Sequence, residues 1–158
     1  MNEKNLVAMM QKSFAVRGKL ISDIIYLERS IDEYLARYFC DDADKRTDLM
    51  KTILCTRKIT LDNKKEVFLF LLKKVNPDWL LKYPTVNADL NDLIEERNRF
   101  AHYILNSNET NVDNYTGDFE LINFKNNIEI KPYNDIRISE LEIKIEKYIK
   151  AINELLLP

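Results

Sequence analysis

Glycine and proline are scarce in this chain, which has 2 glycines and 4 prolines among 158 residues. Folds rich in strands need many turns built on these two residue types, so their scarcity argues against such a fold. With 46% hydrophobic and 32% charged residues, the composition instead favours a mostly helical protein. The length is that of a single domain, and we expect one domain over residues 1–158.

Cysteine, histidine and long apolar runs are also rare. The two cysteines, Cys40 and Cys55, are too few for a disulfide framework, and neither stands in a metal-ligand spacing. One histidine and scattered carboxylates make a poor transition-metal site, so we expect no metal and no cofactor. No signal peptide and no apolar run long enough to cross a bilayer is apparent, so we expect no membrane association and a cytoplasmic location.

Neither sign of charge dominates, since 24 basic residues stand against 26 acidic ones and the net charge is −2. This balance argues against a general nucleic-acid coat, which would be strongly basic, but leaves room for a local basic cleft. Lys12, Arg17 and Lys19 are candidates for a patch that attracts phosphate. Alternatively, these three side chains form a solvated helix face.

Apolar residues that recur at steps of three and four predict helices along most of the chain. The predicted helical segments are Asn5 to Cys40 with a break or bend at Gly18, Thr47 to Thr56, Leu61 to Val75, Thr85 to Leu105, and a last helix capped by Ser139 and ending near Leu155. The acidic run Asp41 to Asp44 is expected to be a turn. The apolar run Val67 to Leu72 indicates a central core helix, and Trp79 is expected to anchor packing.

Two short strands are predicted between the last two helices. Asn106 to Gly117 is polar and rich in asparagine, as in a loop. Phe119 to Phe124 and Ile128 to Tyr133 are rich in β-branched and aromatic residues, and the asparagines of Lys125-Asn126-Asn127 tolerate the positive φ of a tight turn. The predicted fold class is therefore mainly α, a four-to-five-helix up-down bundle with a small β-hairpin inserted before the last helix.

The only histidine, His102, lies in the predicted helix from Thr85 to Leu105, five residues after Arg97. Positions 86, 90, 93, 97, 100 and 104 alternate steps of four and three, so Arg97 is expected on an apolar stripe, where a charge is costly unless it is paired or bound. Arg97 and His102 are about 140° apart around an ideal helix, whereas Asn98 and His102 are neighbours on one face. Two copies of this helix, packed about a twofold axis in a homodimer, would bring two arginines and two histidines around one cleft.

The pattern Arg97-Asn98-x-x-x-His102 resembles the Arg-x4-His signature of the HEPN superfamily, small helical domains of which many are metal-independent ribonucleases in toxin–antitoxin and phage-defence systems. Asn98 fits, because the family commonly carries Asn, Asp or His after the arginine. Some members carry a tyrosine two residues after the histidine. Here Ile104 holds that place and Tyr103 directly follows the histidine.

The resemblance implies a homodimeric endoribonuclease that cleaves RNA without metal and leaves 2′,3′-cyclic phosphate ends. A protein antitoxin or inhibitor would be a further partner of such a toxin or defence effector. His102 would act as general base or acid, Arg97 would hold the phosphate, and Asn98 would orient His102 or the phosphate. Arg99 and Tyr103 are candidates for substrate binding.

Each of these residues also has a structural interpretation. Arg97 could pair with an acid such as Glu28, Arg99 with Glu95 one turn earlier, and Tyr103 could pack. Two other functions are therefore open. One is a non-catalytic HEPN-like module that binds RNA, a nucleotide or a protein. The other is a helical regulatory adaptor, although no helix-turn-helix with a basic recognition helix is visible.

Overall fold

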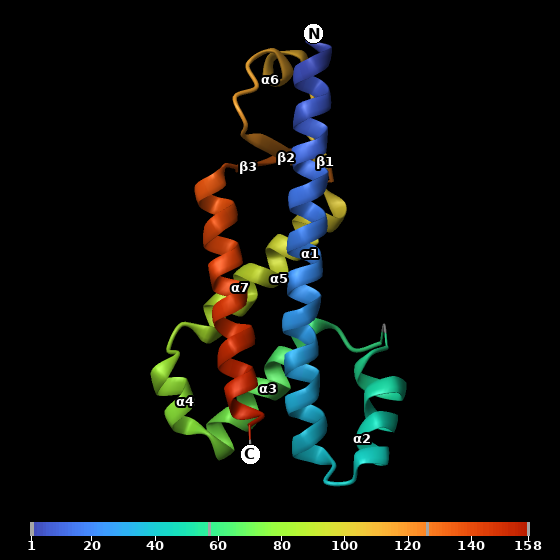
Figure 1. Cartoon of the computed structure of the whole chain (residues 1–158), viewed down its shortest axis with the longest axis vertical. Helices are drawn as coiled ribbons and strands as arrows, with labels where there is room; N and C mark the ends of the chain where they lie inside the picture. Colours follow the sequence, from blue (N-terminus) through green and yellow to red (C-terminus); the bar gives the residue numbers. More distant parts are fainter. Residues whose placement is uncertain (1, 57, 126, 158) are drawn as a thin grey trace. The chain divides into compact units, whose positions relative to one another are not determined.

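The computed structural model describes residues 2–56, 58–125 and 127–157. The protein is mainly helical with a small antiparallel sheet, as the composition predicts (Figure 1). The described elements are α1 (Glu3–Phe39), α2 (Ala43–Leu49), the π-helical turn η1 (Met50–Leu54), α3 (Leu61–Val75), α4 (Pro77–Lys82), α5 (Val86–His102), β1 (Ile104–Leu105), α6 (Glu109–Asp113), β2 (Phe119–Asn123), β3 (Glu129–Tyr133) and α7 (Asp135–Leu155).

The chain divides into two compact units. The first unit comprises Met1–Asp23 and Glu95–Lys144, and the second comprises Ile24–Ile94 and Ile145–Pro158. Helices α1, α5 and α7 contribute residues to both units. The first unit contains the sheet and the last two turns of α5, so it holds every candidate site residue.

The sheet of the first unit has the strand order β1-β2-β3, with both pairs antiparallel. The hairpin of β2 and β3 confirms the prediction of two strands before the last helix, although each strand is one residue shorter at the turn. The predicted turn residue Asn126 lies outside the described residues. The sheet packs its aromatic side chains on α5, since the Tyr133 ring lies 4.9 Å from that of Phe100 and 5.4 Å from that of Phe119.

Three predicted boundaries in the first unit are wrong. Gly18 does not break α1, because one glycine costs a helix interior only about 1 kcal/mol and the buried residues of the flanking turns outweigh that cost. The predicted loop from Asn106 to Gly117 contains the short helix α6, whose first turn is capped by the Asn108 side chain. Ser139 lies inside α7, and the Asn134 side chain instead accepts from the main-chain N–H of Arg137 at 2.8 Å.

In the second unit, the predicted turn at Asp41 to Asp44 is confirmed for Asp41 and Asp42, which form a bend between α1 and α2. The Asp42 carboxylate accepts from the main-chain N–H of Lys45 at 2.9 Å and caps α2, so this helix begins at Ala43 rather than near Thr47. A side-chain carboxylate at this position satisfies an N–H group that has no partner within the helix. Only the second half of the run, Ala43 and Asp44, is the start of a helix instead of a turn.

Helix α3 has the predicted bounds, but its core face differs from the prediction. Val67 and Phe70, in the middle of the apolar run, are exposed, whereas Lys64 is buried. The Lys64 ammonium binds the carboxylates of Glu28 and Asp32, which compensate its burial. Glu28, considered above as a partner of Arg97, is thus paired with Lys64.

Trp79 is buried in the second unit, as predicted. Its indole N–H donates to the main-chain carbonyl of Ala151 at 3.1 Å, and its ring lies 6.0 Å from that of Phe68. A buried tryptophan whose N–H has a partner fixes the elements that it touches. It therefore anchors α4 against α3 and α7.

None of the helices is both long enough and apolar enough to span a bilayer, over the residues that the structure describes.

Candidate active site

The candidate site occupies the C-terminal end of α5. This helix ends at His102, three residues earlier than predicted, and Ile104 and Leu105 continue as strand β1. The main-chain N–H of Tyr103 still bonds to the carbonyl of Arg99 at 2.9 Å, so helical geometry persists up to the strand. The helix stops because the two apolar residues that follow pair with β2 instead.

Arg97 lies at the margin of the apolar face rather than within it. The buried positions of α5 are Val86, Leu90, Leu93, Glu96 and Phe100. The charged residue in the core is therefore Glu96, with 4% of its surface exposed, and Arg97 is half-buried beside it. The predicted apolar stripe is therefore wrong at position 97, since the buried face passes through position 96 instead. The prediction counted Ile104 as part of the helix, but Ile104 lies in β1.

Glu96 organises the interior of the site. Its carboxylate accepts from the Tyr133 hydroxyl at 2.6 Å, from Nη1 of Arg99 at 2.9 Å and from Nη2 of Arg137 at 3.0 Å. These charge-assisted bonds compensate the burial of the carboxylate. Burial, reinforced by the acceptor Glu96, raises the pKa of Tyr133 well above its usual range, so its hydroxyl remains a donor. Residues from α5, β3 and α7 are thereby joined.

Arg17 of α1 satisfies two carbonyl groups at the end of α5. Its Nε donates to the main-chain carbonyl of Phe100 at 2.8 Å, and its Nη2 donates to that of Tyr103 at 3.1 Å. The last carbonyls of a helix lack partners within it, and a cation there also meets the negative end of the helix dipole. Burial lowers the pKa of Arg17, but a guanidinium remains charged at any ordinary pH.

Arg99 and Tyr103, predicted to bind substrate, both have partners within the protein. Arg99 donates to Glu95 at 3.0 Å, as the alternative interpretation expects, and also to Glu96. Burial alone would lower the pKa of Arg99, but Glu96 and other neighbours more than offset this and raise it. The Tyr103 hydroxyl donates to Glu129, and this bond lowers the pKa of that carboxyl.

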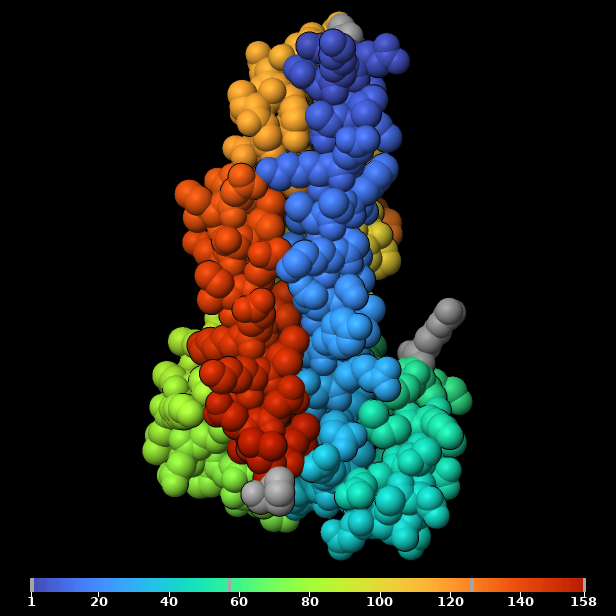
Figure 2. Space-filling view, viewed as in Figure 1, coloured from blue at the N-terminus to red at the C-terminus, as the bar shows by residue number. Residues whose placement is uncertain are grey.

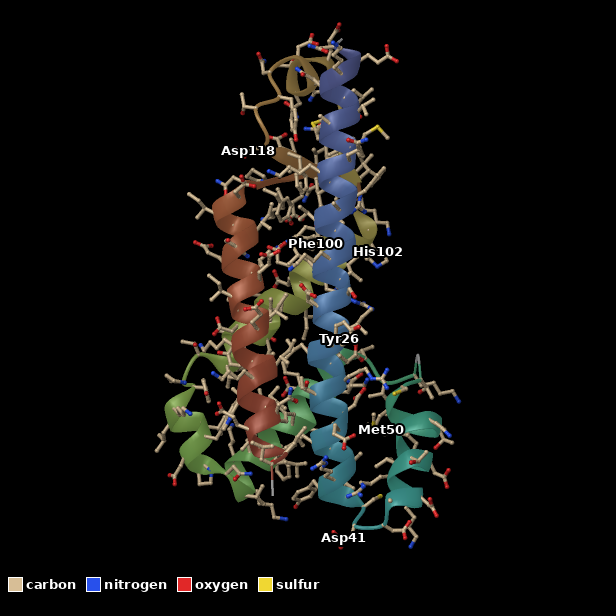
Figure 3. The ribbon with its side chains drawn as sticks, in the orientation of Figure 1. Tyr26, Asp41, Met50, Phe100, His102 and Asp118 are labelled. Carbon is tan, nitrogen blue, oxygen red and sulfur yellow. The ribbon has the colours of Figure 1, made fainter. Side chains whose placement is uncertain are left out.

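The motif residues Arg97, Asn98 and His102 form fewer hydrogen bonds and ion pairs with the described residues than Arg99 and Tyr103 do. Nη1 of Arg97 reaches Oδ1 of Asn98 at 3.5 Å, the long limit of a hydrogen bond, and no carboxylate among the described residues lies within 4.0 Å of its guanidinium. Asn98 and His102 are exposed, and the imidazole of His102 bonds to none of the described residues. Figure 3 labels His102 and the buried Phe100, which lie within one turn of each other on α5.

The other cations considered for phosphate binding are neutralised. Lys12 pairs with Asp135 at 2.6 Å, and Lys19 pairs with Asp23 at 3.0 Å and with Glu142 at 2.9 Å. These lysines, like Arg17, are bound within the unit and do not form a free basic patch. Among the cations that the structure describes at the end of α5, Arg97 remains available to an anion.

Within the described ranges, no group of three or more His, Cys, Asp or Glu side chains is arranged to hold a metal ion. Arg97, Asn98 and His102 present a guanidinium, a carboxamide and an imidazole at the end of α5, where the Glu95 carboxylate is also exposed. An imidazole can act as a general base or acid, and a guanidinium can bind two oxygens of a phosphate.

Sequence reasoning did not find the residues that support the site. Glu96, Tyr133 and Arg137 come from three separate elements, and nothing in their sequence spacing indicates that they meet. Arg17 was considered only together with Lys12 and Lys19, as part of a patch that attracts phosphate or of a solvated helix face. The single local signal was the three-residue step from Glu96 to Arg99, a favourable spacing for an ion pair on a helix.

Comparison of the chain with models of protein families, with curated proteins and with solved structures finds no match.

Proposed function

We propose that the protein is a metal-independent endoribonuclease of the HEPN type, with a composite active site formed by two copies of the chain. The observation that carries the proposal is the contrast between Arg97 and its neighbours. Arg17, Arg99 and Arg137 are all bound to carbonyls or carboxylates of the first unit, whereas Arg97 has no such partner among the described residues. A half-buried guanidinium left available beside an exposed histidine suits a phosphate ligand.

The chemistry requires two proton-transfer groups. His102 of one copy takes the proton of a ribose 2′-hydroxyl, and the 2′-oxygen then bonds to the adjacent phosphorus. The bond from phosphorus to the 5′-oxygen breaks, and His102 of the second copy donates a proton to this leaving oxygen. Arg97 stabilises the charge that develops on the phosphate oxygens, and Asn98, four residues before His102, orients the imidazole or the phosphate. The products carry a 2′,3′-cyclic phosphate and a 5′-hydroxyl.

The proposal extends to the domain organisation and to the arrangement of the helices. The chain would be one HEPN-like domain over residues 1–158, in which the long helices α1, α3, α5 and α7 form an up-down bundle and the hairpin precedes the last helix. It would act on cytoplasmic RNA as a toxin or phage-defence effector, restrained by a protein antitoxin or inhibitor. Arg99 and Tyr103 would contact the RNA next to the reacting phosphate.

A non-catalytic HEPN-like module is the second proposal. It is favoured by the near-neutral charge of −2 and by the neutralisation of Lys12 and Lys19, which leave little positive charge to hold a long RNA. Such a module would bind RNA, a nucleotide or a protein through the same end of α5 without cleaving it.

The test is cleavage of synthetic RNA in the presence of EDTA by the wild type and by Arg97→Ala and His102→Ala. Arg37→Ala is the matched control, since Arg37 lies in the second unit and pairs with Glu33 on the surface. We expect cleavage with cyclic phosphate ends by the wild type and the control, and a loss of at least about 100-fold in both site variants. RNA binding by an inert wild type would instead support the second proposal.

A further inference from the structure

The sheet has a second apolar face, on which Ile122 is buried at the centre and the surrounding apolar side chains are exposed. The register aligns Ile104 with Ile122 and Ile122 with Ile130, so these three side chains form a row across all three strands. Because side chains alternate along a strand, they point away from the core face that carries Phe119 and Tyr133.

The row continues beyond the ends of the strands. Phe124 directly follows β2 and Ile128 directly precedes β3, each an even number of residues from Ile122 or Ile130. The exposed fractions are 55% for Ile104, 47% for Ile130, 63% for Phe124 and 69% for Ile128. Antiparallel sheets in water usually keep one face polar, and a gathered apolar face is typical of a surface that binds a partner. We call these four residues with Ile122 the outer sheet face.

We propose that the outer sheet face binds a second copy of this chain and that this contact assembles the composite active site. The inference rests on the proposed function, which needs two histidines although each chain has one. Ile104 follows His102 by two residues, so their Cα atoms are at most about 7 Å apart. A twofold axis that passes through the outer sheet face close to Ile104 would therefore bring the two copies of His102 toward each other.

The apolar character of the outer sheet face suits contact with the same face of a second copy. In a twofold contact each residue meets the same surface of the partner, and an apolar patch is complementary to itself without any matching of charges. The exposed parts of the four side chains amount to about 400 Å², roughly half of the ~800 Å² that each partner buries in a standard interface. The end of α5 adjoins the patch, and its exposed Ala101 and His102 extend the contact toward the site.

A second apolar surface in the same unit serves as the competing interface. Val7, Met10 and Phe14 are exposed on α1, and Figure 2 shows that no other element covers the first part of this helix on the face in view. Phe14 lies one turn before Arg17, so this surface also lies close to α5. If the outer sheet face is the interface, a charge at Ile130 should dissociate the dimer and a charge at Phe14 should not. If the α1 surface is the interface, the reverse should hold.

The experiment is light scattering after size-exclusion chromatography of the full-length chain, at micromolar concentration, for the wild type, Ile130→Lys, Phe14→Lys and Ile143→Lys. Ile143 is the matched control, since it is an isoleucine of the same unit with 66% of its surface exposed, but on α7. We expect a dimer for the wild type, the control and Phe14→Lys, and a monomer for Ile130→Lys. Lysine is well tolerated on an edge strand, and should Ile130→Lys fail to fold, Ile128→Lys replaces it.

A monomeric wild type, or a dimer that survives Ile130→Lys, would overturn the inference, as would dissociation by Phe14→Lys alone. The two proposals fail in different ways. RNA cleavage by a dimer that survives Ile130→Lys contradicts only the outer sheet face as the interface. An inert wild type that Ile130→Lys dissociates contradicts only the ribonuclease and supports the interface.

Discussion

Arg17 donates from Nε to the main-chain carbonyl of Phe100 at 2.8 Å, which ties α1 to the last turn of the helix that carries Arg97 and His102. Its second bond, to the carbonyl of Tyr103, holds the chain where α5 becomes β1. One side chain thus fixes the end of α5 on both sides of the histidine. The position of His102 therefore depends on a residue far away in sequence.

Replacing Arg17 by methionine should loosen the end of α5. The variant keeps the length of the side chain but loses two charge-assisted bonds, so we expect a loss of about 2–3 kcal/mol in the free energy of unfolding. Amide hydrogen exchange at Tyr103 should accelerate together with that of the last turn of α5. Arg29→Met is the control, since Arg29 is exposed on the same helix. Equal exchange rates at Tyr103 in both variants would contradict this role of Arg17.

Glu96→Gln should be among the most destabilising isosteric changes in the first unit. The change removes the buried carboxylate charge that Arg99 and Arg137 share, and leaves them their more exposed partners Glu95 and Glu140. We expect a loss of about 3–5 kcal/mol, the usual cost of breaking a buried ion pair from one side. Urea unfolding measures this difference. Glu95→Gln removes only an exposed pair with Arg99 and should cost less than about 1 kcal/mol, so equal costs would show that Glu96 is not central.

The buried cluster of Asp32, Glu28 and Lys64 in the second unit should make stability depend on pH. Burial raises the pKa of Asp32 to about 6, although Lys64 opposes this shift, and one oxygen of Asp32 has no hydrogen-bond partner among the described residues. A carboxyl whose pKa is higher in the folded than in the unfolded protein contributes stability below the unfolded value, near 3.8, and loses it as the pH rises through about 6.

Asp32→Asn should remove this dependence. Relative to the wild type, we expect the variant to gain stability as the pH rises from about 4 to about 7, in urea unfolding followed at several pH values. The comparison cancels the titration of groups that both proteins share. Asp62→Asn is the control, because Asp62 is exposed. A constant difference between Asp32→Asn and wild type across this range would contradict the raised pKa.

Local features of the fold were predictable from sequence, and features set by distant contacts were not. Helix α3 has the predicted bounds because Thr60 and Asn63 form a capping box that the local sequence specifies. The hairpin of β2 and β3 follows from alternating β-branched and aromatic residues. Strand β1 was missed because Ile104 continues the helical spacing, and only its pairing with Ile122 makes it a strand.

The candidate site was predictable only in its motif. The spacing of Arg97, Asn98 and His102 can be read from the sequence, but the choice of which charge is buried cannot. Glu96 rather than Arg97 enters the core because Tyr133 and Arg137, on β3 and α7, supply its donors. Such a choice depends on tertiary partners, which a periodic pattern on one helix does not contain.

The measurement that tests the composite active site most directly is RNA cleavage by mixed dimers. Wild type and His102→Ala are co-expressed at varied ratios and assayed on synthetic RNA in EDTA, with total protein constant. If each cleft needs both histidines, only dimers of two wild-type copies cleave, so activity falls with the square of the wild-type fraction. An equal mixture then retains about one quarter of the activity. A linear fall to about one half, or no cleavage by the wild type, would contradict the composite active site.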